Sequence, residues 1–266
     1  MNRFTFALAL GAGLVLSLAG PSVHATPIVQ DLATPTMTAA EFNSLFQAIP
    51  GAAPVLSSYQ FLNTPTTGTV GSEVFQGTGP ATGLYAYAYQ IAVNNVADNT
   101  GQPTSVNSAT LAFNGTPTPA SFTSGSTPSS VYVVTNGPVG SLNVPQAAPG
   151  SVIQTPTSVA WMPGTKTGAL TFQYLDATQN TGPLQANSTS GTIVVLTNQP
   201  YTTSQPLLPV SLQNADPQIT YPTAYSAQGG VIQEVPAPEP ATVLAWAGMI
   251  GAVALVRHVR GNRQAA

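Results

Sequence analysis

The sequence contains no cysteine and very little charge, and each absence excludes a class of function. Its 266 residues include five Lys and Arg and eight Asp and Glu, so 5% of the chain is charged, against about 25% in an ordinary soluble domain. Without cysteine the chain can form no disulfide, no thiolate nucleophile and no cysteine metal site. Its solubility must therefore come from hydroxyl and amide side chains.

The basic residues lie mostly at the two ends of the chain. Arg3 is near the start and Arg257, Arg260 and Arg263 are near the finish, which leaves Lys166 as the only cation between them. Nucleic-acid backbones are bound by clusters of Lys and Arg. A middle section with one lysine cannot supply such a cluster, so we expect no nucleic-acid partner.

Histidine is absent from the body of the chain, because His24 and His258 lie in the two end segments. A Ser-His-Asp triad needs an imidazole, and zinc sites need His or Cys. A serine-lysine dyad would need a serine three residues before Lys166, where the chain has Pro163. We therefore predict no catalytic, cofactor-binding or metal-binding residue and no enzymatic activity.

The acidic residues of the body leave two alternative functions open, glycoside hydrolysis and calcium binding. A pair of carboxylates facing one cleft would make it a surface glycosidase, although no spacing selects such a pair. Residues 98–101 and 176–180 carry loop oxygens that could bind calcium, but neither matches the twelve-residue calcium loop. Asx turns are the favoured interpretation of both segments.

Residues 1–25 have the pattern of a signal peptide. Arg3 gives a positive start, residues 4–19 form an apolar run, and Val23 and Ala25 stand where signal peptidase accepts small side chains. We predict cleavage after Ala25. The alternative is an N-terminal membrane anchor that stays uncut.

The C-terminal 29 residues, 238–266, combine three features in a fixed order. The motif Pro238-Glu239-Pro240 precedes residues 241–256, which carry no charge, and Arg257, Arg260 and Arg263 follow. As a helix, 241–256 would be about 24 Å long, slightly less than the hydrocarbon core of about 30 Å. The prolines disfavour helix at the motif, and the arginines favour a cytoplasmic end, so the body would lie outside.

This order resembles the PEP-CTERM sorting signal of Gram-negative bacteria, which the membrane enzyme exosortase recognises. The resemblance covers the tail alone. It implies export, processing near the motif, and association with the cell surface or an exopolysaccharide matrix. The alternative is a membrane-tethered adhesin whose tail is never cut.

The body, residues 26–225, is predicted to be an antiparallel β-sandwich with one short N-terminal helix. Thr38 and Glu41 fit a capping box, and apolar residues continue at helical spacing to Ile49 before Pro50-Gly51. Glycine- and proline-rich turns then separate short alternating runs. The predicted strands are residues 69–75, 84–93, 110–113, 131–134, 159–162, 169–175 and 192–197.

Three further expectations concern the body and its junction with the tail. Tyr85, Tyr87 and Tyr89 fall on one face of residues 84–93 and are interpreted as core residues, with a sugar-stacking platform as the alternative. The proline-rich segment 206–222 is predicted to be an edge strand or covering arm. Residues 226–237 form the linker to the sorting tail.

Overall fold

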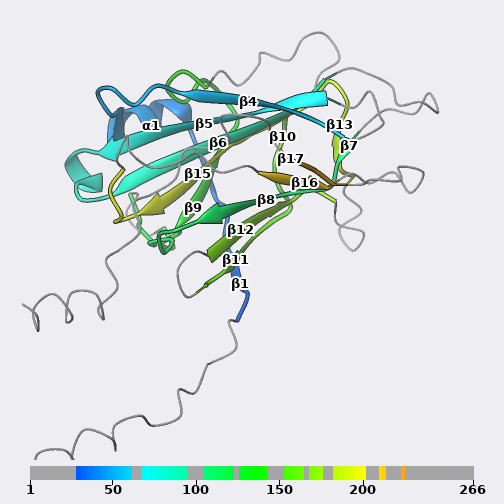
Figure 1. Ribbon diagram of the computed structural model, residues 1–266. Coiled ribbons are helices and arrows are strands. Elements are labelled where there is room, and N and C mark those ends of the chain that lie inside the picture. The colour runs from blue at the N-terminus through cyan, green and yellow to red at the C-terminus, as the bar shows by residue number, and fades with distance from the viewer. Residues whose placement is uncertain are drawn as a thin grey trace, which may run out of the picture.

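Two β-sheets that face each other make up most of the structure, and the predicted mainly β class is confirmed (Figure 1). The computed structural model describes residues 28–61, 67–94, 105–122, 126–142, 153–164, 168–175, 182–201, 210–213 and 223–225. Within these ranges there is one α-helix, α1 (Ala39–Leu45), and one turn of 3-10 helix, η1 (Gly79–Ala81).

The first sheet has six strands, and every neighbouring pair in it is antiparallel. In spatial order these strands are β1 (Gln30–Leu32), β11 (Ser158–Met162), β12 (Gly168–Gln173), β8 (Ser108–Phe113), β16 (Ser211–Gln213) and β17 (Thr223–Tyr225).

The second sheet has nine strands and is mixed. Its centre is β6, which pairs antiparallel with β5 on one side and with β15 and β14 on the other, while β2 runs parallel to β9 and β10 runs parallel to β14. Its strands are β2 (Thr36–Met37), β3 (Phe46–Ala48), β4 (Val55–Gln60), β5 (Thr67–Gly77), β6 (Tyr85–Val93), β9 (Val131–Val134), β10 (Ile153–Gln154), β14 (Thr189–Ser190) and β15 (Thr192–Thr197). A separate two-stranded sheet joins β7 (Ser105–Val106) to β13 (Leu184–Gln185).

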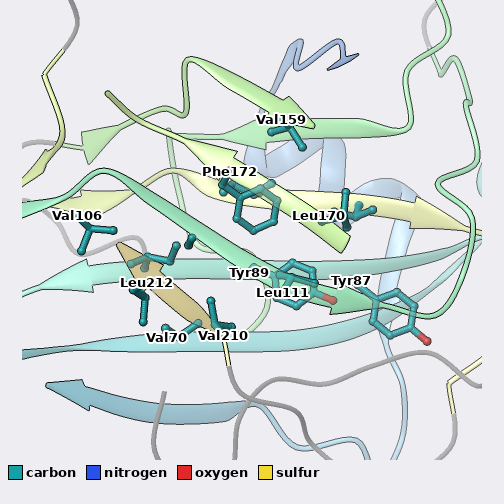
Figure 2. Packing of buried hydrophobic residues seen from close by; sticks show 14 of the residues in the cluster. Val70, Tyr87, Tyr89, Val106, Leu111, Val159, Leu170, Phe172, Val210 and Leu212 are labelled. Atoms are coloured by element: carbon teal, nitrogen blue, oxygen red, sulfur yellow. The ribbon is translucent and has the colours of Figure 1, made fainter. Parts of the chain in front are cut away.

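The main hydrophobic cluster lies between the two large sheets (Figure 2). Tyr89 of β6 packs on Phe172 of β12 with ring centroids 6.1 Å apart, and Tyr87 packs edge-on against Phe113 of β8 at 6.0 Å. These contacts join strands of different sheets. Tyr87 and Tyr89 are 0% and 1% exposed, which confirms their interpretation as core residues, and Tyr85 packs half-buried against the same cluster. These three residues therefore form no exposed platform for sugar stacking.

A second cluster covers the opposite face of the nine-stranded sheet. Ala86 and Ala88 of β6 point to this side, where α1 contributes Phe42 and Leu45. Because alanine projects little from the sheet, these two side chains of the helix can approach the strand closely. The centre of this sheet is therefore buried on both faces, and β6 is apolar on both apart from Gln90.

The helix begins as predicted and ends earlier. The Thr38 hydroxyl accepts a 3.1 Å hydrogen bond from the N–H of Glu41, as expected of an N-cap. The helical spacing suggested a continuation to Ile49, but α1 ends at Leu45 and Phe46 begins β3, which pairs with β5. Strand pairing with β5 satisfies the backbone there and overrides the local helical pattern.

Every predicted strand corresponds to a strand of the structure, from β5 to β15. Of the segment 206–222 the structure describes residues 210–213, and here the edge-strand prediction needs correction, because β16 is paired on both sides, with β8 and β17. It is not an edge strand. Its three residues, Ser-Leu-Gln, contain no proline, so each can take part in the hydrogen-bonded ladder.

Candidate functional site

The predicted sorting residues lie outside the part of the chain that the structure describes. This applies to the cleavage position Ala25, to Pro238, Glu239 and Pro240, and to the arginines 257, 260 and 263. Lys166 and the candidate calcium segments 98–101 and 176–180 lie outside it too. No helix among the described residues has the length and apolar character needed to cross a membrane. A functional site must therefore be sought in the folded body itself.

A groove lies where the chain crosses from one sheet to the other, between β1 and β2. Its volume is about 420 Å³, within the range of about 300–1,000 Å³ typical of small-molecule sites. We call it the crossover groove. It is lined by Ala33, Pro35, Thr36 and Met37 of the crossing segment, Glu41 of α1, and Phe122, Ser126, Thr127, Ser129 and Tyr132.

Hydrogen bonds hold the crossing segment against β9 and the residues before it. The Ser129 hydroxyl donates to the Ala33 carbonyl oxygen over 2.7 Å, and the N–H of Val133 donates to the Pro35 carbonyl oxygen over 3.0 Å. Beyond Pro35, the parallel ladder between β2 and β9 continues the pairing. The backbone walls of the groove are therefore set by the fold before any ligand arrives.

Two aromatic residues line the groove. Phe122 and Tyr132 have ring centroids 5.9 Å apart with a 43° tilt, and Phe122 also contacts Phe46 edge-on at 5.7 Å. The Tyr132 hydroxyl donates to the Ala120 carbonyl oxygen over 2.6 Å. Packing on one side and this hydrogen bond on the other keep both rings in place, while Phe122 stays half-exposed.

Glu41 is the acidic group of the groove. Its half-buried side chain extends from the first turn of α1, whose start is set by the Thr38 cap. Burial raises the pKa of the Tyr132 hydroxyl, the backbone N–H of Ser129 lowers it, and the nearby Glu41 carboxylate raises it further. Tyr132 is therefore a neutral hydrogen-bonding group near pH 7, and the charge in the groove is that of Glu41.

The described residues contain three acids and no basic side chain: the acids are Asp31, Glu41 and Glu73, and all five Lys and Arg lie elsewhere in the chain. Glu73 is 3% exposed and accepts a hydrogen bond from the Ser141 N–H, so it does not face a cleft. Nowhere in the described ranges do three metal-ligating side chains gather. The lining of the groove includes one carboxylate, whereas glycoside hydrolysis uses two.

A second hollow, of about 530 Å³, lies over the paired ends of β4, β5 and β6. Its polar groups bond to one another: Asn94 donates to the Thr67 hydroxyl over 2.8 Å, and the Tyr59 hydroxyl donates to the Ala92 carbonyl oxygen over 2.9 Å. Tyr59 is buried, so this hollow offers no aromatic ring to a ligand. The crossover groove is the better candidate.

Comparison with known proteins does not assign this groove a role. No protein family, curated protein or solved structure matches the chain. The groove must therefore be interpreted from its own chemistry, which combines aromatic rings, hydroxyl groups and one carboxylate.

Sequence reasoning missed the groove because its two halves are far apart in the chain. Residues 33–41 and 122–132 are brought together by the pairing of β2 with β9 and by the hydrogen bond from Ser129 to Ala33. One local signal could have drawn attention to Phe122, a lone aromatic residue in a stretch of Thr, Ser, Gly and Pro from residue 115 to 130. An isolated aromatic side chain in such a loop has no strand period to explain it.

Proposed function

We propose that the protein is an exported, surface-sorted β-sandwich that serves as a structural or binding component of the cell envelope or its exopolysaccharide matrix. Signal peptidase removes residues 1–25, and an exosortase-type enzyme processes the tail after membrane insertion of helix 241–256. The observation that carries the proposal is the ordered tail of Pro238-Glu239-Pro240, an uncharged apolar segment and three arginines. These are the features that such an enzyme needs to find in one substrate.

Every described strand lies between the two segments that the proposed processing removes. The first described strand begins at Gln30, after the predicted cut at Ala25, and the last ends at Tyr225, before the predicted linker. Removing both end segments would take away no described strand. A preformed groove with one carboxylate favours a binding role over hydrolysis.

The test is the intact mass and C-terminal peptide of the protein recovered from the envelope and the medium of its own host. We expect a chain that begins at Thr26 and ends close to Pro238. Glu239→Ala should leave the tail attached, because it removes the charged residue of the motif, whereas Glu234→Ala in the linker should be processed normally. These two variants make the same chemical change five residues apart.

Two results would count against the proposal. A wild-type protein that still carries the peptide through Arg263 would be a membrane-tethered adhesin with an uncut tail. Equal processing of the Glu239→Ala and Glu234→Ala variants would show that cleavage does not depend on the motif. In either case export would be judged separately, from whether residues 1–25 are missing.

A further inference from the structure

We propose that the crossover groove binds an uncharged pyranose unit of a neutral polysaccharide, with the Glu41 carboxylate accepting hydrogen bonds from sugar hydroxyls and the Phe122 ring contacting the apolar face of the sugar. The inference rests on the proposed binding role and names the ligand class of its site.

Charge is the first reason for this choice of ligand. The ionised group of the groove is a carboxylate, and no basic side chain occurs anywhere in the described part of the chain. A uronic acid, a phosphate or a sulfated sugar would bring a second negative charge toward Glu41 without a counter-charge, which is unfavourable. An uncharged polyol avoids this repulsion and can donate its hydroxyl protons to the carboxylate.

The mixture of surfaces is the second reason. A pyranose ring has C–H faces that are apolar and hydroxyl groups around its edge. The groove offers a half-exposed aromatic ring at Phe122, and it offers the hydroxyls of Thr36 and Thr127 besides Glu41. Hydrogen bonds to an ionised acceptor are about twice as strong as neutral ones. A purely apolar ligand would displace water from this carboxylate and offer it no hydrogen-bond donor in exchange, at a cost in free energy.

Preorganisation is the third reason. The Phe122 and Tyr132 rings are fixed by Phe46 and by the Ala120 carbonyl oxygen, and the Ser129 hydroxyl holds the crossing segment. A sugar that enters therefore does not have to order these two aromatic side chains, which would otherwise reduce its affinity. One small groove binds one sugar unit weakly, and many copies on a matrix would together bind a polymer firmly.

The experiment measures binding of neutral oligosaccharides to the full chain in detergent micelles. The probes are tetrasaccharides of α-linked and β-linked glucose, of mannose and of galactose, with tetragalacturonate as the anionic comparison. Saturation-transfer NMR identifies a binder, and calorimetric titration gives its dissociation constant. We expect saturable binding of at least one neutral probe and none of tetragalacturonate.

Two pairs of variants assign the binding to the groove. Glu41→Ala and Phe122→Ala should each weaken binding at least about tenfold. Their matched controls, Asp31→Asn on the exposed face of β1 and Leu56→Ala, which is 72% exposed in the wild type, should bind as the wild type does. Thermal unfolding checks that each variant is folded. If Phe122→Ala is not, Glu41→Ala and Glu41→Gln decide the question alone.

The proposal is overturned if none of the neutral probes binds the folded protein, if tetragalacturonate binds more tightly, or if folded groove variants bind like their controls. None of these results tests whether the tail is processed. Conversely, an uncut tail in the host would refute the sorting proposal and leave the sugar titration unchanged.

Discussion

At the scale of single residues, Glu73 is the most unusual group in the structure, because it is a buried carboxylate that organises a turn. It is 3% exposed and accepts a 2.8 Å hydrogen bond from the N–H of Ser141. Gly140 of the same turn has a φ of 58°, and a Cβ there would lie 2.6 Å from a Glu73 carboxylate oxygen. Glycine is thus required both for its conformation and for the close approach.

Burial raises the pKa of Glu73, and the backbone hydrogen bonds from Ser141 and Leu142 lower it by less. A raised pKa means that the native state holds a proton more tightly than the unfolded chain does. The stabilising contribution of that proton is complete below the unfolded pKa and is lost as the pH rises through the folded pKa.

The prediction for Glu73 concerns the slope of stability against pH. Glu73→Gln cannot titrate, so its free energy of unfolding should fall less than that of the wild type as the pH rises from about 4 to about 8, a range that spans ordinary and raised Glu pKa values. Urea denaturation at several pH values measures both curves. Leu56→Ala, which changes an exposed side chain that does not titrate, should keep the wild-type slope. Parallel curves for Glu73→Gln and the wild type would contradict the assignment.

At the scale of elements, β4 shows how strand pairing decides which face is buried. Its residues alternate, but Ser57 is buried at 1% exposure while the neighbouring Leu56 is exposed. Val55 and Tyr59 share the inward face with Ser57, so Leu56 is the one apolar side chain on the outward face. The register with β5, in which Ser57 pairs with Val70 and Tyr59 with Gly68, fixes this orientation and buries Tyr59.

The helix α1 depends on its cap, because seven residues are too few to form a stable helix alone. Thr38→Ala removes the hydroxyl that accepts from the Glu41 N–H and should lower the free energy of unfolding by about 1 kcal/mol. Thr38→Ser keeps the hydroxyl and should change stability by much less. Urea denaturation of the three proteins gives the comparison, and equal stability of the Ala and Ser variants would show that the cap does not matter.

At the scale of the whole molecule, the cluster between the sheets joins them into one unfolding unit. Phe172, fully buried, comes from the six-stranded sheet and packs on Tyr89 of the nine-stranded sheet. Because these side chains share one core, neither sheet can open without exposing the apolar face of the other.

Phe172→Ala should therefore lower the free energy of unfolding by about 3–5 kcal/mol, the usual cost of a large cavity in a core. Leu56→Ala, at an exposed position, should change it by no more than about 0.5 kcal/mol. Near-UV and far-UV circular dichroism should report the same transition in each protein. Separate transitions for the two signals would show that the sheets unfold independently.

Much of the fold was predictable from local patterns. The alternation of Tyr and Ala in β6, the glycine- and proline-rich turn at η1 and the Thr38 cap are all found where the sequence placed them. Each depends on residues a few positions apart, so the relevant physics is contained in a short window. The crossover groove was not predictable, since no window includes both Glu41 and Phe122.

The sequence by itself determined the mainly β class, the core role of Tyr87 and Tyr89 and the scarcity of charge, because alternation and composition act without reference to distant segments. Only the tertiary structure decided that α1 stops at Leu45, that β16 is paired on both sides and that β4 turns Leu56 outward. In each case strand pairing between distant segments satisfied backbone hydrogen bonds and buried apolar area, and these gains exceed the small free-energy differences that local propensity can supply.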